Sequence, residues 1–181
     1  MNNFILITKT LNNNLSIAKN SLTSNSFKIE KVSEKFFSDI KNLLGVYLID
    51  HNAVDYPMFK KRFLLYYSFV NYVTKNKSFF FSRVVNNTVS LSSVYPCSEW
   101  LERESFDFFG IFYANHPDLR RILTDYGFPS YALRKDFPVQ GYFDLVYSIS
   151  NKKIQFKEIE FQQSFRVFLK ENPYHTHLIS K

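Results

Sequence analysis

Three apolar runs in close succession constrain the fold more than any other feature of the sequence. They span residues 46–50, 62–70 and 78–85, and they are rich in Val, Phe, Tyr and Leu, as strands are. Residues 33–44 precede them with apolar positions at helical spacing; Ser33 is the expected N-cap and Gly45 the stop. Residues 51–58, which include Pro57, are expected to form a loop. This order predicts an α+β fold with a small mixed helix/strand layer, and not a doubly wound α/β fold.

A second helix is predicted from Ser98, as N-cap, to a stop at Gly110. Projection at ~100° per residue divides its positions into two arcs. The expected apolar arc contains Trp100, Leu101, Glu104, Ser105, Phe108 and Phe109. The expected polar arc contains Glu102, Arg103, Phe106 and Asp107, in which Arg103 and Asp107 are four apart and suited to pair. Phe106, an aromatic residue on that arc, could mark contact with another chain.

The C-terminal third predicts an extended arm. Residues 142–149 and 154–161 both alternate, and a turn at 151–153 separates them, which is typical of a β-hairpin. Residues 110–140 show little regular pattern. We therefore expect a polar N-terminal lead-in over residues 1–35, an α+β domain over 36–125 and an extended arm over 126–181. Within residues 1–30 only Phe4–Ile7 is expected to form a strand.

Composition excludes several classes of protein. With 4 Gly the chain has no glycine-rich phosphate loop, and with 1 Cys it has neither an internal disulfide nor a Cys-ligated iron–sulfur cluster. No apolar stretch approaches the ~20 residues that span a bilayer. The 21 Phe and 12 Tyr, with abundant Lys and Asn, match A/T-rich codon usage of the kind found in organelle genomes. The N-terminal residues lack the arginines of a transit peptide.

The net charge of +7 admits a different function. Basic residues interleaved with aromatic ones suit RNA, through phosphate contacts and stacking, so a mitochondrial RNA- or ribosome-associated basic protein is the alternative hypothesis. The positive charge is diffuse, however, and flanks an acidic centre between Glu99 and Arg121.

Few residues suggest catalysis or metal binding. Glu102, Glu104, Asp107 and His116 include the right ligand types for a metal, but Glu102 and Glu104 point ~200° apart on a helix. Glu104, inside the apolar arc, needs an arginine partner, for which Arg120, Arg121 and Arg134 are candidates. Four of the seven arginines lie between Arg103 and Arg134, and we expect Arg103, Arg120, Arg121 and Arg134 to form ion pairs within the fold or across an interface.

A long ordered string of residues resembles a known family. Residues 102–111 read ERESFDFFGI, residues 116–123 read HPDLRRIL, residues 124–128 read TDYGF and residues 133–138 read LRKDFP. Upstream, Val54-Asp55-Tyr56-Pro57 and the basic run to Arg62 match as well. The chain is similar to the thirty-kilodalton subunit family of respiratory complex I, in its mitochondrially encoded form. One departure is Ser130-Tyr131-Ala132, where the family usually has Gly-His-Pro.

The resemblance implies a non-catalytic subunit of the peripheral arm, in the quinone module, that scaffolds NADH:ubiquinone electron transfer coupled to proton translocation. It implies a position on the matrix side of the mitochondrial inner membrane, no transmembrane span and no nucleic-acid partner. The implied partners are other complex I subunits, chiefly the hydrogenase-like large subunit; FMN and iron–sulfur clusters would lie in other subunits, and this chain would bind no cofactor or metal. The expected structural and interface residues are Glu102, Arg103, Glu104, Asp107, Gly110, His116, Pro117, Asp118, Arg120, Arg121, Arg134, Lys135 and Asp136.

Overall fold

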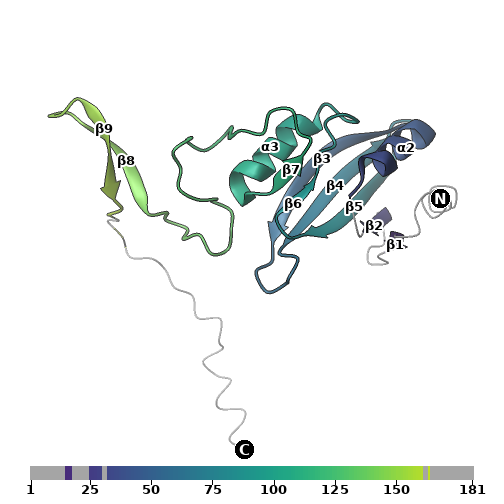
Figure 1. Cartoon of the computed structure of the whole chain (residues 1–181), viewed down its shortest axis with the longest axis horizontal. Helices are drawn as coiled ribbons and strands as arrows, with labels where there is room; N and C mark the ends of the chain where they lie inside the picture. Colours follow the sequence, from purple (N-terminus) through teal and green to yellow (C-terminus); the bar gives the residue numbers. More distant parts are fainter. Residues whose placement is uncertain (1–14, 18–24, 30–31, 161–162, 164–181) are drawn as a thin grey trace, which may run out of the picture. The chain divides into compact units, whose positions relative to one another are not determined.

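The computed structural model describes residues 15–17, 25–29, 32–160 and 163, and its contacts divide the chain into two units, 1–139 and 140–181 (Figure 1). The first unit contains a five-stranded sheet in the order β1-β2-β5-β4-β3. The pairs are antiparallel except β2–β5, which is parallel. The strands are β1 (Leu15–Ile17), β2 (Asn25–Ile29), β3 (Val46–Asp55), β4 (Phe63–Asn71) and β5 (Lys77–Val84).

Helix α2 (Glu34–Leu44) lies where the sequence predicts it. The Ser33 hydroxyl accepts a hydrogen bond from the backbone N–H of Phe36 at 3.4 Å, and Gly45 ends the helix with a φ of 57°. Its buried side chains pack on the sheet, where the Phe37 ring lies 5.4 Å from that of Phe69. The buried positions of β4 alternate through residues 63, 65, 67 and 69, so this face of the sheet is the core face.

Strand β3 is longer than predicted. Residues 51–55, which the sequence assigned to a loop, continue the strand and pair with β4. The register shifts between Leu48 and Asp50, so the buried positions change from 46 and 48 to 51, 53 and 55. This irregularity interrupts the period-2 pattern, which is why the run appears to end at Asp50 in the sequence.

The N-terminal residues also differ from the prediction. β1 and β2 lie inside the expected lead-in, whereas Phe4–Ile7 lies outside the described residues. Phe27 and Ile29 of β2 are buried, and the Phe27 ring stacks on Phe80 of β5 at 5.2 Å. The partner strand of β2 follows about fifty residues later, so local pattern alone gives little sign of the pairing.

Helix α3 (Ser98–Phe109) has two buried sides. Ser98, Glu102, Ser105 and Phe109 lie on the side toward the sheet, where the Phe109 and Phe63 rings are 6.2 Å apart. Arg103 and Asp107 lie on a second buried side. The predicted cap is wrong: Cys97 is the N-cap and makes no side-chain capping bond, while Ser98 is the first helical residue and is buried. Short parallel strands β6 (Asn87–Val89) and β7 (Phe112–Ala114) flank the helix in the chain.

The second unit contains the predicted hairpin, with β8 (Phe143–Ser148) and β9 (Lys153–Glu158) paired antiparallel. Between β7 and β8, residues 115–142 contain neither helix nor strand, as their irregular pattern predicts. Within the described residues, no helix is long and apolar enough to cross a membrane.

Candidate functional site

Glu102 is completely buried between α3 and the loop that follows β6. Its carboxylate accepts hydrogen bonds from the backbone N–H of Leu91 at 2.7 Å and from the Ser90 hydroxyl at 2.6 Å. Burial raises the pKa of Glu102 to about 7, and these hydrogen bonds only partly oppose the rise. The predicted arcs are therefore wrong here, because the buried carboxylate is Glu102 and not Glu104.

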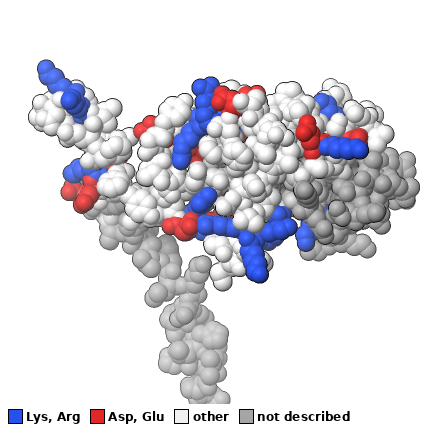
Figure 2. Space-filling view, viewed as in Figure 1, with Lys and Arg blue, Asp and Glu red and all other residues white. Residues whose placement is uncertain are grey.

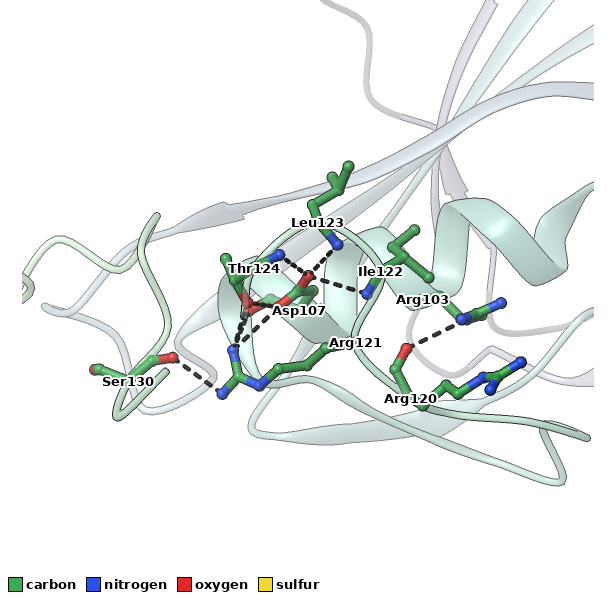
Figure 3. A network of polar contacts seen from close by, with 8 residues as sticks. All are labelled: Arg103, Asp107, Arg120, Arg121, Ile122, Leu123, Thr124 and Ser130. Carbon is green, nitrogen blue, oxygen red and sulfur yellow. Dashed lines mark hydrogen bonds and ion pairs between the residues drawn. The ribbon is translucent and has the colours of Figure 1, made fainter. Parts of the chain in front are cut away.

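Asp107 organises the segment that follows β7 (Figure 3). Its carboxylate accepts hydrogen bonds from the backbone N–H groups of residues 122, 123 and 124 at 3.2, 2.8 and 2.8 Å, and from the Thr124 hydroxyl. The Arg121 guanidinium donates to it at 3.0 Å and also to the Ser130 carbonyl at 3.1 Å. Burial would raise the pKa of Asp107, but the bonds from Thr124, Leu123 and Ile122 outweigh it and lower the pKa to about 2.

Gly110 and Arg134 close the end of α3. Gly110 has a φ of 72°, and a Cβ there would lie 2.5 Å from the Tyr131 ring and 2.6 Å from the Arg134 guanidinium. Arg134 donates from Nε to the Phe109 carbonyl at 2.7 Å, one of the carbonyls left without a helical partner. Its guanidinium lies 4.4 Å from the Tyr131 ring, so the tyrosine at the departure from the family pattern packs into this site.

A fourth set of contacts joins two motifs that are 80 residues apart. Asp55, at the buried end of β3, binds Arg62 through two 2.6 Å hydrogen bonds and accepts the backbone N–H of Lys135 at 2.8 Å. Arg62 also donates to Asp136 at 3.1 and 2.8 Å. Burial alone would raise the pKa of Asp55, but the hydrogen bonds from Arg62 and Lys135 lower it. The hydrogen bonds from Arg62 also lower the pKa of the exposed Asp136. The sequence analysis missed the pairing of Asp55 with Arg62; the signals for it were the family match at residues 54–57 and an arginine at the end of a lysine run.

The remaining predicted residues have local roles. His116 donates from Nε2 to the Glu99 carbonyl at 3.2 Å and accepts the Asp118 backbone N–H at 3.1 Å. Pro117 is exposed, and Asp118 pairs with Arg120 at 2.9 Å on the exposed surface. The prediction of an Arg103–Asp107 pair is wrong, since Arg103 donates to the Arg120 carbonyl at 3.2 Å. Of the four arginines, Arg120 and Arg121 form ion pairs, whereas Arg103 and Arg134 bind backbone carbonyls.

Glu104 and Phe106 are both partly buried on α3. Glu104 is half-buried and makes no hydrogen bond or ion pair with any described residue. The predicted pairing with Arg120, Arg121 or Arg134 is therefore wrong. Phe106 is partly buried against the core of this chain, with its ring 6.4 Å from that of Tyr131. The exposed aromatic residue of α3 is instead Trp100, which is 62% accessible.

The buried polar residues of α3 and of the end of β3 have structural roles. The buried carboxylates of Glu102, Asp107 and Asp55 are occupied by hydrogen bonds and ion pairs with their own chain. Over the residues that the structure describes, no group of three His, Cys, Asp or Glu side chains could hold a metal ion. On the face shown in Figure 2, basic side chains form separate groups among uncharged surface and no continuous basic track. A face of this kind gives no support to an RNA-binding function.

Comparison with known proteins gives the family. The family model described as "Respiratory-chain NADH dehydrogenase, 30 Kd subunit" matches residues 25–143, which include α2, α3 and the polar contacts described above. The chain belongs to this family. The match confirms the resemblance drawn from the sequence, and nothing in the comparisons favours the alternative of a basic RNA-associated protein.

Relatives from mitochondria-bearing organisms and from bacteria are similar to the chain. It is 43% identical over 129 residues to NADH-ubiquinone oxidoreductase subunit 9 of Prototheca wickerhamii, covering 70% of this chain and 67% of that one. It is 42% identical over 123 residues to an NADH-quinone oxidoreductase subunit of the bacterium Parvibaculum lavamentivorans, covering 67% and 62%. NADH dehydrogenase [ubiquinone] iron-sulfur protein 3 of Solanum tuberosum is 44% identical, with 67% and 65% covered. The chain thus spans about two thirds of these relatives' length.

Two solved structures share the fold. A trypsin-resistant fragment (1-134) of Nqo5 matches with a TM-score of 0.55 at 20% identity, covering 65% of this chain and 98% of the fragment. A chain of the membrane-bound sulfane sulfur reductase, an archaeal respiratory membrane complex, matches with a TM-score of 0.66 at 19% identity, covering 76% and 85%. These matches confirm the predicted α+β fold.

Proposed function

We propose that the chain is a non-catalytic subunit of the peripheral arm of mitochondrial respiratory complex I, in the quinone module. There it would scaffold NADH:ubiquinone electron transfer coupled to proton translocation, on the matrix side of the inner membrane. The observation that carries this proposal is that the family's ordered motifs meet in one internal network around Asp107, Arg134 and Asp55. Side chains occupied in this way stabilise a surface, and they are not free for proton transfer or nucleophilic attack.

The absence of a cofactor is part of the proposal. The relative from Solanum tuberosum is named an iron-sulfur protein, but a Cys-ligated cluster takes four thiolates and these 181 residues contain one cysteine, Cys97. FMN and the iron–sulfur clusters would accordingly belong to other subunits of the complex.

The hairpin of the second unit supplies the strongest candidate contact with a partner. Leu145 pairs opposite Phe156 and Tyr147 opposite Ile154, so these four side chains share one face with Phe143. All five are between 50% and 69% accessible. The opposite face carries polar residues, including Asp144, Lys153 and Lys157. A two-stranded hairpin is marginally stable alone, so we infer that a partner covers the apolar face.

We propose that this partner is the hydrogenase-like large subunit of the quinone module. The motif segment would contribute a second contact. Asp107 and Arg134 hold residues 122–134 against α3, and this leaves Leu123 at 60% and Leu133 at 50% accessibility. The predicted structural and interface residues would act by fixing this outward surface.

Native gels of solubilised mitochondrial membranes test the proposal. A tagged chain should migrate with NADH:ubiquinone activity, and a pull-down should recover the large subunit. Leu145→Asp with Phe156→Asp should abolish this recovery, whereas Val73→Asp, at a turn residue that is 87% accessible, should leave it intact. Absence of the wild-type chain from complex I would refute the proposal. Undiminished recovery of the large subunit by the doubly substituted chain would exclude the hairpin as the contact.

A further inference from the structure

The loop between β3 and β4 presents a surface that the motif network does not use. We define the loop patch as Tyr56, Met58, Phe59, Lys61 and Arg83. Met58 is 94% accessible and Phe59 53%, so two adjacent apolar side chains face solvent at this loop. An open pocket of about 340 Å³ borders the patch, with Lys61 and Arg83 in its lining together with the polar residues Asn87 and Thr88.

Arg83 is the central charge of the loop patch. Its guanidinium lies 4.1 Å from the centre of the Phe59 ring and 5.0 Å from that of Tyr56. No carboxylate of the described residues pairs with it, and its Nη1 is buried without a hydrogen-bond partner. A guanidinium that has lost water on one side gains more from a nearby anion than a fully hydrated one.

The neighbouring Arg62 behaves differently. Asp55 and Asp136 already balance its charge, and they also anchor the end of the loop. The Tyr56 N–H donates to the Arg62 carbonyl at 2.9 Å, which closes the base of the loop. Basic side chains gather in the lower middle of the view in Figure 2, at the place of the β3–β4 loop in Figure 1. The loop that carries the patch is therefore fixed at its base. The loop patch itself has an excess of positive charge and no acidic partner among the described residues.

We propose that the loop patch docks an acidic segment of a neighbouring protein chain, with an Asp or Glu carboxylate between Arg83 and Lys61 and an apolar side chain over Met58 and Phe59. Arginine, aromatic residues and methionine together are the composition enriched in protein interfaces. Capture of a free anion would leave Met58 and Phe59 without a role, so the observations favour a protein. The proposal rests on the proposed function, because it assumes that the chain works inside an assembly.

Site-directed photo-crosslinking on the full chain in the assembled complex tests the proposal. A photoreactive residue replacing Met58 should attach to a partner segment that contains Asp or Glu. Lys61→Glu, at an exposed position, should reduce the crosslink by about fivefold, and Arg83→Gln should do the same. Lys77→Glu reverses an exposed lysine at the opposite end of β5 and should change nothing.

The outcomes separate the loop patch from the function of the chain. A crosslink to an acidic segment that weakens in both variants supports docking. Attachment only to lipid, attachment to a segment without acidic residues, or no attachment in a chain that still migrates with complex I would overturn docking and leave the proposed function standing. A full-strength crosslink in the folded Lys61→Glu variant would also overturn it. Absence of the chain from complex I is the separate failure of the proposed function.

Discussion

Asparagine at position 107 would keep the shape of the aspartate side chain while removing its charge. In the native chain the carboxylate accepts three backbone N–H groups, the Thr124 hydroxyl and the Arg121 guanidinium. Asp107→Asn turns one acceptor into an NH₂ group that must face some of these donors, and it leaves Arg121 without its partner. The substitution therefore tests whether Asp107 holds residues 121–124 in place.

The structure gives the size of the effect. The pKa of Asp107 falls from 3.8 to about 2, and at ~1.4 kcal/mol per unit this favours the charged form by about 2 kcal/mol. Removing one partner from a buried pair typically costs ~3–5 kcal/mol, because the remaining charge and donors are left unsatisfied. For a chain of this size that corresponds to a fall in Tm of roughly 6–20 °C.

Thermal and denaturant melts of Asp107→Asn and Asp118→Asn form the assay. Asp118 pairs with Arg120 on the exposed surface, so its substitution should cost no more than ~1 kcal/mol. Because the folded pKa of Asp107 lies below its unfolded value, its contribution is complete above about pH 4 and is lost as the pH falls through about 2. Equal melting of the two variants, or an unchanged acid dependence in Asp107→Asn, would refute the reasoning.

Two further predictions concern Glu102 and the glycines that end α2 and α3. The pKa of Glu102 is raised from 4.5 to about 7, so folding stability should decline by about 3 kcal/mol as the pH rises across that range, and Glu102→Gln should remove the decline in melts at several pH values. Gly45 and Gly110 both have positive φ, but a Cβ meets nothing within 4 Å at Gly45 and lies 2.5 Å from Tyr131 at Gly110. Gly45→Ala should therefore cost ~1–2 kcal/mol, and Gly110→Ala at least ~1 kcal/mol more in the same unfolding measurement; equal costs would contradict the packing argument.

Local patterns predicted the elements whose signals lie within a few residues. Helix α2 has its cap, its apolar spacing and its terminating glycine in one short segment, and all three are as predicted. The hairpin β8–β9 is similar, because alternation and a nearby turn specify its pairing. Strand β2 was missed because its stability comes from pairing with β5 and from burial of Phe27 and Ile29, which are contacts distant in sequence.

Helix α3 shows where sequence reasoning fails. Hydrophobicity places carboxylates on the solvent side, yet Glu102 and Asp107 are buried while Trp100 is exposed. The reason is that the backbone donors at residues 91 and 122–124 lie beside the helix and require acceptors. Nothing in the periodicity of residues 98–109 reveals those donors, since they belong to segments before and after the helix.

The sequence by itself determined the family, the α+β class, the first helix and the hairpin, because an ordered string of motifs and short-range periodicity are properties of the chain alone. The tertiary structure alone decided which residues of the motifs work together. Asp55, Arg62 and Lys135 meet although up to 80 residues separate them, and Asp107 on α3 meets residues 121–124 of the segment that follows β7. A buried charge is stable only where the fold supplies its partners, and the fold alone brings those partners to it.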